Sequence, residues 1–204
     1  MASDTESANV ALRLVGHTPI TSLTDGSDTA NVVNDLFEEL RDDLLRSHPW
    51  NFATKRAQLA RLSTEPAFEF DYAYAHPSDW LRTISVHDND AGHGSVLYRT
   101  EQVDGQNAIV SSSDAIYLRY VYRVTDQSLM SADFRRAFQL ALARDLSIPL
   151  ASSNTMQEQF SREAARALAR ARSTDALGGF PELRPRGSWA SSRGGFRRDD
   201  FLSD

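Results

Sequence analysis

The sequence contains no cysteine, so disulfides, thiolate nucleophiles and thiolate zinc sites are excluded. It also lacks any run near the roughly eighteen apolar residues that a bilayer-spanning helix needs. The amino-terminal residues, MASDTESA, contain neither the basic region nor the apolar region of an export signal. From these absences we expect a protein that is made in the cytoplasm and has no membrane partner.

Positive charge is scarce as well, since 22 lysines and arginines face 28 aspartates and glutamates and the net charge is −6. This deficit argues against a protein that wraps duplex DNA, because such binding neutralises phosphates with lysine and arginine. It does not exclude DNA that passes along a weakly repelling wall. The 204 residues, 41% hydrophobic and 25% charged, fit one soluble domain with an appendage, or at most two small domains.

The stretch at 28–48 organises the rest of the chain. Its apolar residues recur at three- and four-residue steps, so they form one stripe on a helix, and acidic residues occupy the opposite face. Ser27 or Asp28 can cap the start, and Pro49 ends the helix by disfavouring helical geometry at the residue before it. An acidic face is usually solvated surface, and the alternative is the lining of a lumen or a contact between subunits. The face consists of Asp35, Glu38, Glu39, Asp42 and Asp43.

Similar patterns predict three further helices. Ser3 and Glu6 have the spacing of a capping box, and Ser131 can cap a later helix. Small residues in the last helix would allow close approach to a neighbour. The predicted helices span about 4–15, 28–48, 131–148 and 154–173.

Two of these helices carry opposite charge. The segment 28–46 has six acids and two arginines, whereas 155–173 has four arginines and two glutamates. Such opposition suits neighbouring helices or neighbouring subunits, although exposed ion pairs contribute only about 0 to 1 kcal/mol each. It can set register but does not drive assembly.

Between about 50 and 125 the periodicity changes to that of strands. Aromatic residues alternate with other residues from 68 to 74, which is typical of a half-buried strand, and Asp104-Gly105 is a hairpin signal. The economical interpretation is one antiparallel sheet inserted between the helices. Further strands are predicted at 81–86, 96–99, 108–111 and 116–124.

The composition shifts to glycine, proline, serine and arginine after Leu177. The segment 178–204 cannot bury enough apolar surface to offset its ordering entropy, so we expect a flexible arm whose isolated aromatics dock on a partner; the alternative is a dispensable end. The expected fold class is α+β, an antiparallel bundle of about four helices with an inserted antiparallel β-region in one domain at 1–177, followed by this extended arm. Candidate partner-binding residues are Phe180, Arg184, Arg186, Trp189, Arg193, Phe196, Arg197 and Phe201.

No constellation of residues predicts an enzyme. The segment 87–93 resembles the start of a calcium loop, but Gly92 and Arg99 occupy positions that need ligands, so a polar hairpin tip explains it better. A glycine elbow around a serine and a phosphate-binding fingerprint are both absent. One RGG-like element at 192–198, followed by two aspartates, is weak evidence for RNA binding. We expect no catalytic residue, no metal and no cofactor.

Three segments resemble the tail tubular protein A family of tailed bacteriophages, the adaptor subunits that join the portal to the tail. The first is Arg46-Ser47-His48-Pro49-Trp50-Asn51-Phe52-Ala53, with Leu59-Ala60 after it. The second lies upstream and runs from Asn9 through Gly16 and Pro19 to Leu23. The third is Pro77-Ser78-Asp79-Trp80-Leu81-Arg82. They follow the family's order over roughly 9–175.

The resemblance implies a non-enzymatic structural subunit of a head–tail connector in the virion. It implies a homo-oligomeric ring, expected to be a dodecamer, between the portal protein and a downstream tail or nozzle protein. DNA would pass through this ring without sequence-specific binding, and the arm at 178–204 would clasp the portal. The rival hypothesis is a small non-enzymatic protein- or RNA-binding domain with a docking tail.

Overall fold

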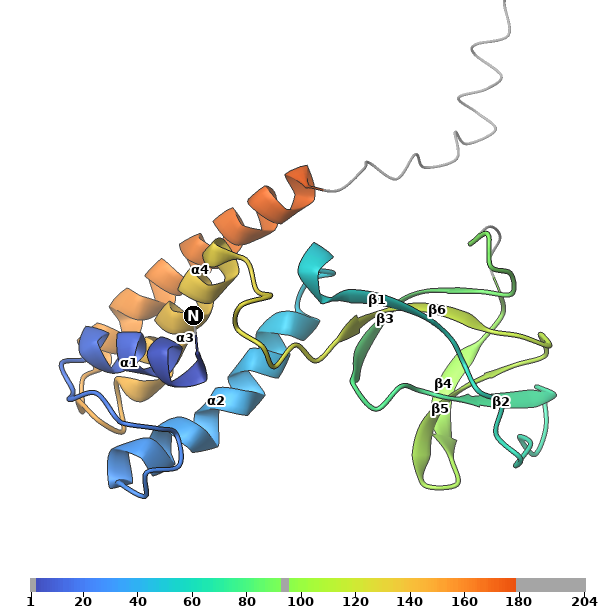
Figure 1. The fold of residues 1–204 in the computed structure, drawn as a ribbon, viewed down its shortest axis with the longest axis horizontal. Helices are drawn as coiled ribbons and strands as arrows, with labels where there is room; N and C mark the ends of the chain where they lie inside the picture. The colour runs from blue at the N-terminus through green and yellow to red at the C-terminus, as the bar shows by residue number, and fades with distance from the viewer. Residues whose placement is uncertain (1–2, 93–95, 179–204) are drawn as a thin grey trace, which may run out of the picture.

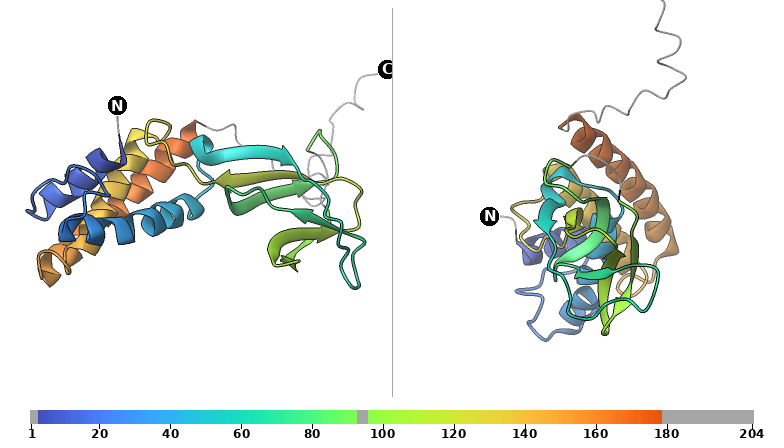
Figure 2. Two further views of the ribbon diagram at one scale, coloured as in Figure 1. Left: turned by 60° about the horizontal axis from the view of Figure 1, so that its bottom comes forward. Right: turned by 90° about the vertical axis from the view of Figure 1, so that its right-hand side faces the viewer.

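The computed structural model describes residues 3–92 and 96–178. The helices gather at one end of an elongated molecule and the strands at the other, which we call the helical lobe and the β-lobe (Figures 1 and 2). Among the described helices, none has the length and apolar character needed to cross a bilayer. The expected arm at 178–204 lies, except for Gly178, outside the described residues.

The four α-helices within the described residues each begin at a serine whose hydroxyl oxygen accepts a hydrogen bond from the backbone amide three residues later. Each such cap stabilises a helix by about 0.5–2 kcal/mol. The last helix continues four residues beyond the predicted end at 173, because no helix breaker occurs before Gly178. The helices are α1 (Asp4–Leu14), α2 (Asp28–Arg46), α3 (Ala132–Leu146) and α4 (Asn154–Leu177), with caps Ser3, Ser27, Ser131 and Ser153.

Helix α3 is the centre of the helical lobe, and the predicted antiparallel bundle with one inserted β-region is wrong. Helices α1, α2 and α4 each pack on α3 and make at most marginal contact with one another. The reason lies in the sequence of α3, where eight of fifteen residues are buried, so apolar side chains leave it in several directions. Phe138 meets Phe37 of α2 edge-on with ring centroids 4.9 Å apart.

In the part of the chain that the structure describes, the strands form two three-stranded antiparallel sheets, so the prediction of a single sheet is also wrong. One sheet has the order β1-β6-β3 and the other β2-β5-β4. Buried side chains from both sheets, including Tyr74, Ile109 and Leu118, form a shared core between them. The strands are β1 (Thr54–Gln58), β2 (Tyr72–Ala75), β3 (Trp80–His87), β4 (Arg99–Val103), β5 (Gln106–Ser111) and β6 (Tyr117–Tyr122).

Several strand boundaries differ from those predicted. Phe68 is 80% exposed in a loop, and Glu69 has a φ of 73°, so the alternation that begins at 68 becomes a strand only at Tyr72. The strand expected at 96–99 instead starts at Arg99. The hairpin signal is confirmed, because Asp104 and Gly105 have φ values of 52° and 74° between β4 and β5, and two positive φ values are what a tight type I′ turn requires.

Candidate functional site

Trp50 lies where the helical lobe meets the β-lobe, directly before the short 3₁₀ helix (Asn51–Ala53) that connects α2 to β1. It is fully buried, and its indole nitrogen donates a hydrogen bond to the carbonyl oxygen of Leu44 at 3.0 Å. Its ring meets Phe134 of α3 edge-on at 5.0 Å and stacks on Phe52 at 5.9 Å. Trp50 and Phe52 therefore fill the apolar space between the end of α2 and the start of α3.

The carboxylate of Asp79, at the entry to β3, joins two further strands. It accepts hydrogen bonds from Lys55 Nζ at 2.8 Å and from the Tyr120 hydroxyl at 3.0 Å. Burial opposes the charged form of Asp79, but these two donors outweigh it and lower the pKa of the carboxyl. Burial and the neighbouring carboxylate raise the pKa of Tyr120 to about 12. The network holds β1, β3 and β6 together where they leave the helical lobe.

Two other hydrogen-bonded contacts involve the residues of the resemblance. Arg82 of β3 donates from Nη1 to the carbonyl oxygen of Arg46 at 3.1 Å, which ties β3 to the last turn of α2. The side chain of Asn9 accepts from the amide of Ile20 at 2.8 Å and donates to its carbonyl at 2.9 Å. These two hydrogen bonds hold the loop after α1 against the helix.

The predicted acidic face lies on the outward side of α2, opposite the buried stripe. Asp42 is only 13% exposed in its side chain and pairs with Arg41 at 3.1 Å and with Arg123, beyond β6, at 2.6 Å. Asp43 pairs with Arg46 at 3.3 Å. In the part of the chain that the structure describes, the remaining acids make no ion pair and are exposed; they are Asp35, Glu38 and Glu39.

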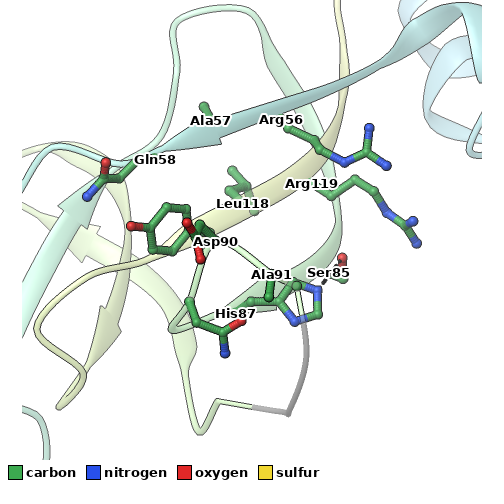
Figure 3. A pocket seen from close by; sticks show the side chains of 12 residues that line it. Arg56, Ala57, Gln58, Ser85, His87, Asp90, Ala91, Leu118 and Arg119 are labelled. Atoms are coloured by element: carbon green, nitrogen blue, oxygen red, sulfur yellow. Dashed lines mark hydrogen bonds between the residues drawn. The ribbon is translucent and has the colours of Figure 1, made fainter.

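A polar pocket of about 390 Å³ opens on one face of the β1-β6-β3 sheet (Figure 3). Arg56 and Arg119 lie directly opposite each other in the β1–β6 register, and Ser85 follows on β3. Figure 3 shows both guanidinium groups pointing the same way, above the pair formed by His87 Nε2 and Ser85 Oγ at 3.1 Å. Like charges placed opposite one another in a sheet are unfavourable, and guanidinium groups are suited to binding an anion such as a carboxylate or phosphate.

Sequence reasoning missed this pocket, because Arg56 and Arg119 are far apart in the chain and no local pattern links them. The segment considered for calcium reaches its rim through His87 and Asp90, while His93 lies outside the described residues. Within 3–92 and 96–178, no group of three or more potential metal ligands gathers.

The predicted arm residues cannot be placed in any site. All of them lie beyond Gly178, outside the described residues: Phe180, Arg184, Arg186, Trp189, Arg193, Phe196, Arg197 and Phe201. Comparison with known proteins adds nothing to the geometry, since no protein-family model matches the chain and a search of curated proteins gives no match.

Proposed function

We propose that this chain is a structural head–tail connector subunit of a tailed bacteriophage. Copies form a ring, expected to be a dodecamer, between the portal protein and a downstream tail or nozzle protein. DNA passes through the ring without sequence-specific binding. The subunit performs no catalysis, and its place is in the virion.

The observation that carries the proposal is that residues in the three segments resembling the connector family make contacts between different helices, strands and loops. Trp50 closes the junction of α2 and α3, Asp79 joins three strands, and Asn9 fixes the loop at Ile20. Arg46 and Arg82 come from two different matched segments and are hydrogen bonded to each other.

The elongated shape supports a geometric mechanism. The helical lobe and the β-lobe lie at opposite ends, so a ring built through one lobe leaves the other available to a different neighbour along the tail axis (Figure 1). Closed cyclic symmetry requires each subunit to present one face to the next copy and a different face to the previous one. Several arms that bind one portal ring raise one another's effective concentration, so weak single contacts give firm attachment.

The decisive experiment is a binding measurement with the portal ring encoded in the same genome. Purified full-length chain is mixed with the portal, and the mass of the complex is measured. A fixed stoichiometry of many copies per portal is the expected result. Removal of 178–204 should abolish attachment and leave the thermal transition of the remaining domain nearly unchanged, since the composition of this segment offers little apolar surface to bury.

The rival hypothesis gives a different outcome in the same experiment. A small protein- or RNA-binding domain would retain RNA during purification, or bind another protein, and would not bind the portal. Failure of the truncated protein to fold would also contradict the proposal, because the arm would then belong to the core and not to a partner contact.

A further inference from the structure

The outward face of α4 carries arginines separated by small residues. Arg162 and Arg166 are four residues apart, about 6 Å along the helix axis, and both are exposed. Ala165 and Ala169 are exposed beside them, so the surface between the arginines is low. Phe160 of α4 faces the other way and is buried in the core of the helical lobe.

Among the residues that the structure describes, these arginines have few acidic partners. Within the described residues, Arg162 and Arg166 make no ion pair, and Arg170 makes only a long contact of 3.9 Å with Asp133 of α3. Helix α4 has 24 residues and is about 36 Å long, against about 22 Å for the 15 residues of α3. It therefore projects beyond the helix that covers its inner side.

The outward face of α2 has the complementary charge at the same spacing. Asp35 and Glu39 are also four residues apart and exposed, and Glu38 lies next to them. The sequence left open whether α2 and α4 attract each other within one chain. In the described structure both helices pack on α3, and no ion pair joins α2 to α4. Two matched faces that cannot meet within one molecule can meet between two.

We infer that the outward face of α4 docks on the outward face of α2 in a second copy of this chain. The contact is heterologous, since it joins two different surfaces, and such contacts close into a ring when the rotation between copies permits. Individual exposed ion pairs are weak, so the charges select the face and the register, and closure of the ring provides the stability. The inference rests on the proposed ring, because it names the surfaces through which neighbouring subunits meet.

The absence of cysteine permits a direct test by disulfide trapping. A full-length variant with Glu39→Cys and Ala169→Cys keeps Arg162, Arg166 and Asp35 intact. Mild oxidation at high protein concentration and low salt should give a ladder of disulfide-linked oligomers. A variant with only one of the two cysteines can form one disulfide, so it should give no product larger than a dimer. A control with Glu101→Cys, on exposed β4, and Ala169→Cys should give no ladder. A double variant that cross-links no more than this control overturns the inference.

Charge reversal in the same double-cysteine chain tests the electrostatic part. Arg162→Glu with Arg166→Glu should lower the cross-linked yield by about fivefold, because like charges then face each other. Adding Asp35→Lys and Glu38→Lys to that chain should restore the yield, which a merely damaged fold would not do. Loss without restoration contradicts the charge pairing. Salt should also weaken trapping, since the Debye length falls from about 10 Å at 0.1 M to about 3 Å at 1 M.

Portal binding separates this inference from the proposed function. Rings that assemble on the portal without the disulfide ladder would leave the function standing and reject the α2–α4 contact. A ladder from a chain that never binds the portal would support the contact and reject the connector role. A chain that shows neither contradicts both.

Discussion

The carboxylate of Asp175, in the last turn of α4, accepts hydrogen bonds at 3.1 and 3.2 Å from the backbone amide of Asn51. The Asn51 side chain in turn donates to the Asp175 carbonyl oxygen at 2.6 Å, and His48 Nε2 lies 3.5 Å from the same carboxylate. The end of α4 is thus tied to the connection between α2 and β1. Asp175 therefore lies beside the connection between the two lobes.

Asp175→Ala should detach this end. Hydrogen bonds to a charged group contribute roughly 1.5–3 kcal/mol, and the Asp175 side chain is only 9% exposed, so we expect a loss of about 1–3 kcal/mol in the free energy of unfolding. Urea denaturation followed by circular dichroism measures it. Glu158→Ala, on the exposed start of the same helix, is the matched control and should change stability by less than about 0.5 kcal/mol. Equal effects of the two variants would show that the contact with Asn51 does not hold α4.

His76→Phe should stabilise the protein, and more so in acid. His76 stacks on Trp80 with ring centroids 4.1 Å apart, and both its ring nitrogens are buried without a hydrogen-bond partner in the described structure. Burial lowers the pKa of His76 below its ordinary value. The unfolded chain therefore binds a proton at His76 more tightly than the folded chain does. The free energy of unfolding is unaffected by this difference above about pH 6.5 and decreases as the pH falls from there through the folded-state pKa.

Thermal melting of wild type and His76→Phe at pH 8 and pH 5.5 measures the difference. The wild-type midpoint should fall further between these two pH values than that of the variant. Part of the fall should persist in the variant, because burial, only partly offset by Asp175, also lowers the pKa of His48. Identical pH dependence in both proteins would contradict a role for His76 in acid sensitivity.

The helices of this fold could largely be predicted from residues that are close together in the sequence. The four serine caps act on amides three residues away, so the start of each helix is written in a few adjacent residues. Strand pairing has no such local signal. Strand β1 reads TKRAQ, without apolar alternation, and it becomes a strand only because β6 offers a free edge. Its register then places Arg56 opposite Arg119, which no inspection of either segment could anticipate.

The opposite charges of α2 and α4 could be read from the sequence, but the position of the two helices relative to each other could not. The sequence identifies both charged faces but allows them to meet within one chain or between chains. Which alternative holds depends on α3, whose buried side chains point toward α2 and α4 from different sides. Similarly, alternation at 68–74 predicts a strand, but the positive φ of Glu69 turns the chain and leaves Phe68 exposed.

Asn9→Ala should loosen the loop between α1 and α2. The variant removes both hydrogen bonds to the backbone of Ile20, whose amide and carbonyl then lose their partners, and about 2 kcal/mol of unfolding free energy should be lost. Asn9→Asp keeps the acceptor for the Ile20 amide but turns a carboxylate oxygen toward the Ile20 carbonyl oxygen, so it should also lower stability while still protecting this amide. Chemical denaturation ranks the variants. Hydrogen exchange at the Ile20 amide should accelerate strongly in Asn9→Ala and weakly in Asn9→Asp; the reverse order would contradict this geometry.

Asp79 and Tyr120 should behave as a coupled pair. Because the pKa of Tyr120 is raised to about 12, its stabilising contribution is present below its ordinary value of about 10 and is lost as the pH rises toward 12. Asp79, whose pKa is lowered, gives a contribution that is lost as the pH falls below about 3.8. Asp79→Asn should therefore lower the pKa of Tyr120, as followed by NMR of labelled tyrosine rings.

A double-mutant cycle with Asp79→Asn and Tyr120→Phe isolates this hydrogen bond from the packing of the two side chains. Each single variant removes the charged acceptor or the hydroxyl donor while keeping nearly the same shape. We expect a coupling free energy of about 1 kcal/mol, since the bond at 3.0 Å is partly buried. The ion pair with Lys55 should add little, because the lysine is 46% exposed and screened by solvent. Strictly additive effects would mean that Asp79 holds β3 through Lys55 alone, and Lys55→Met should then reproduce the whole loss seen in Asp79→Asn.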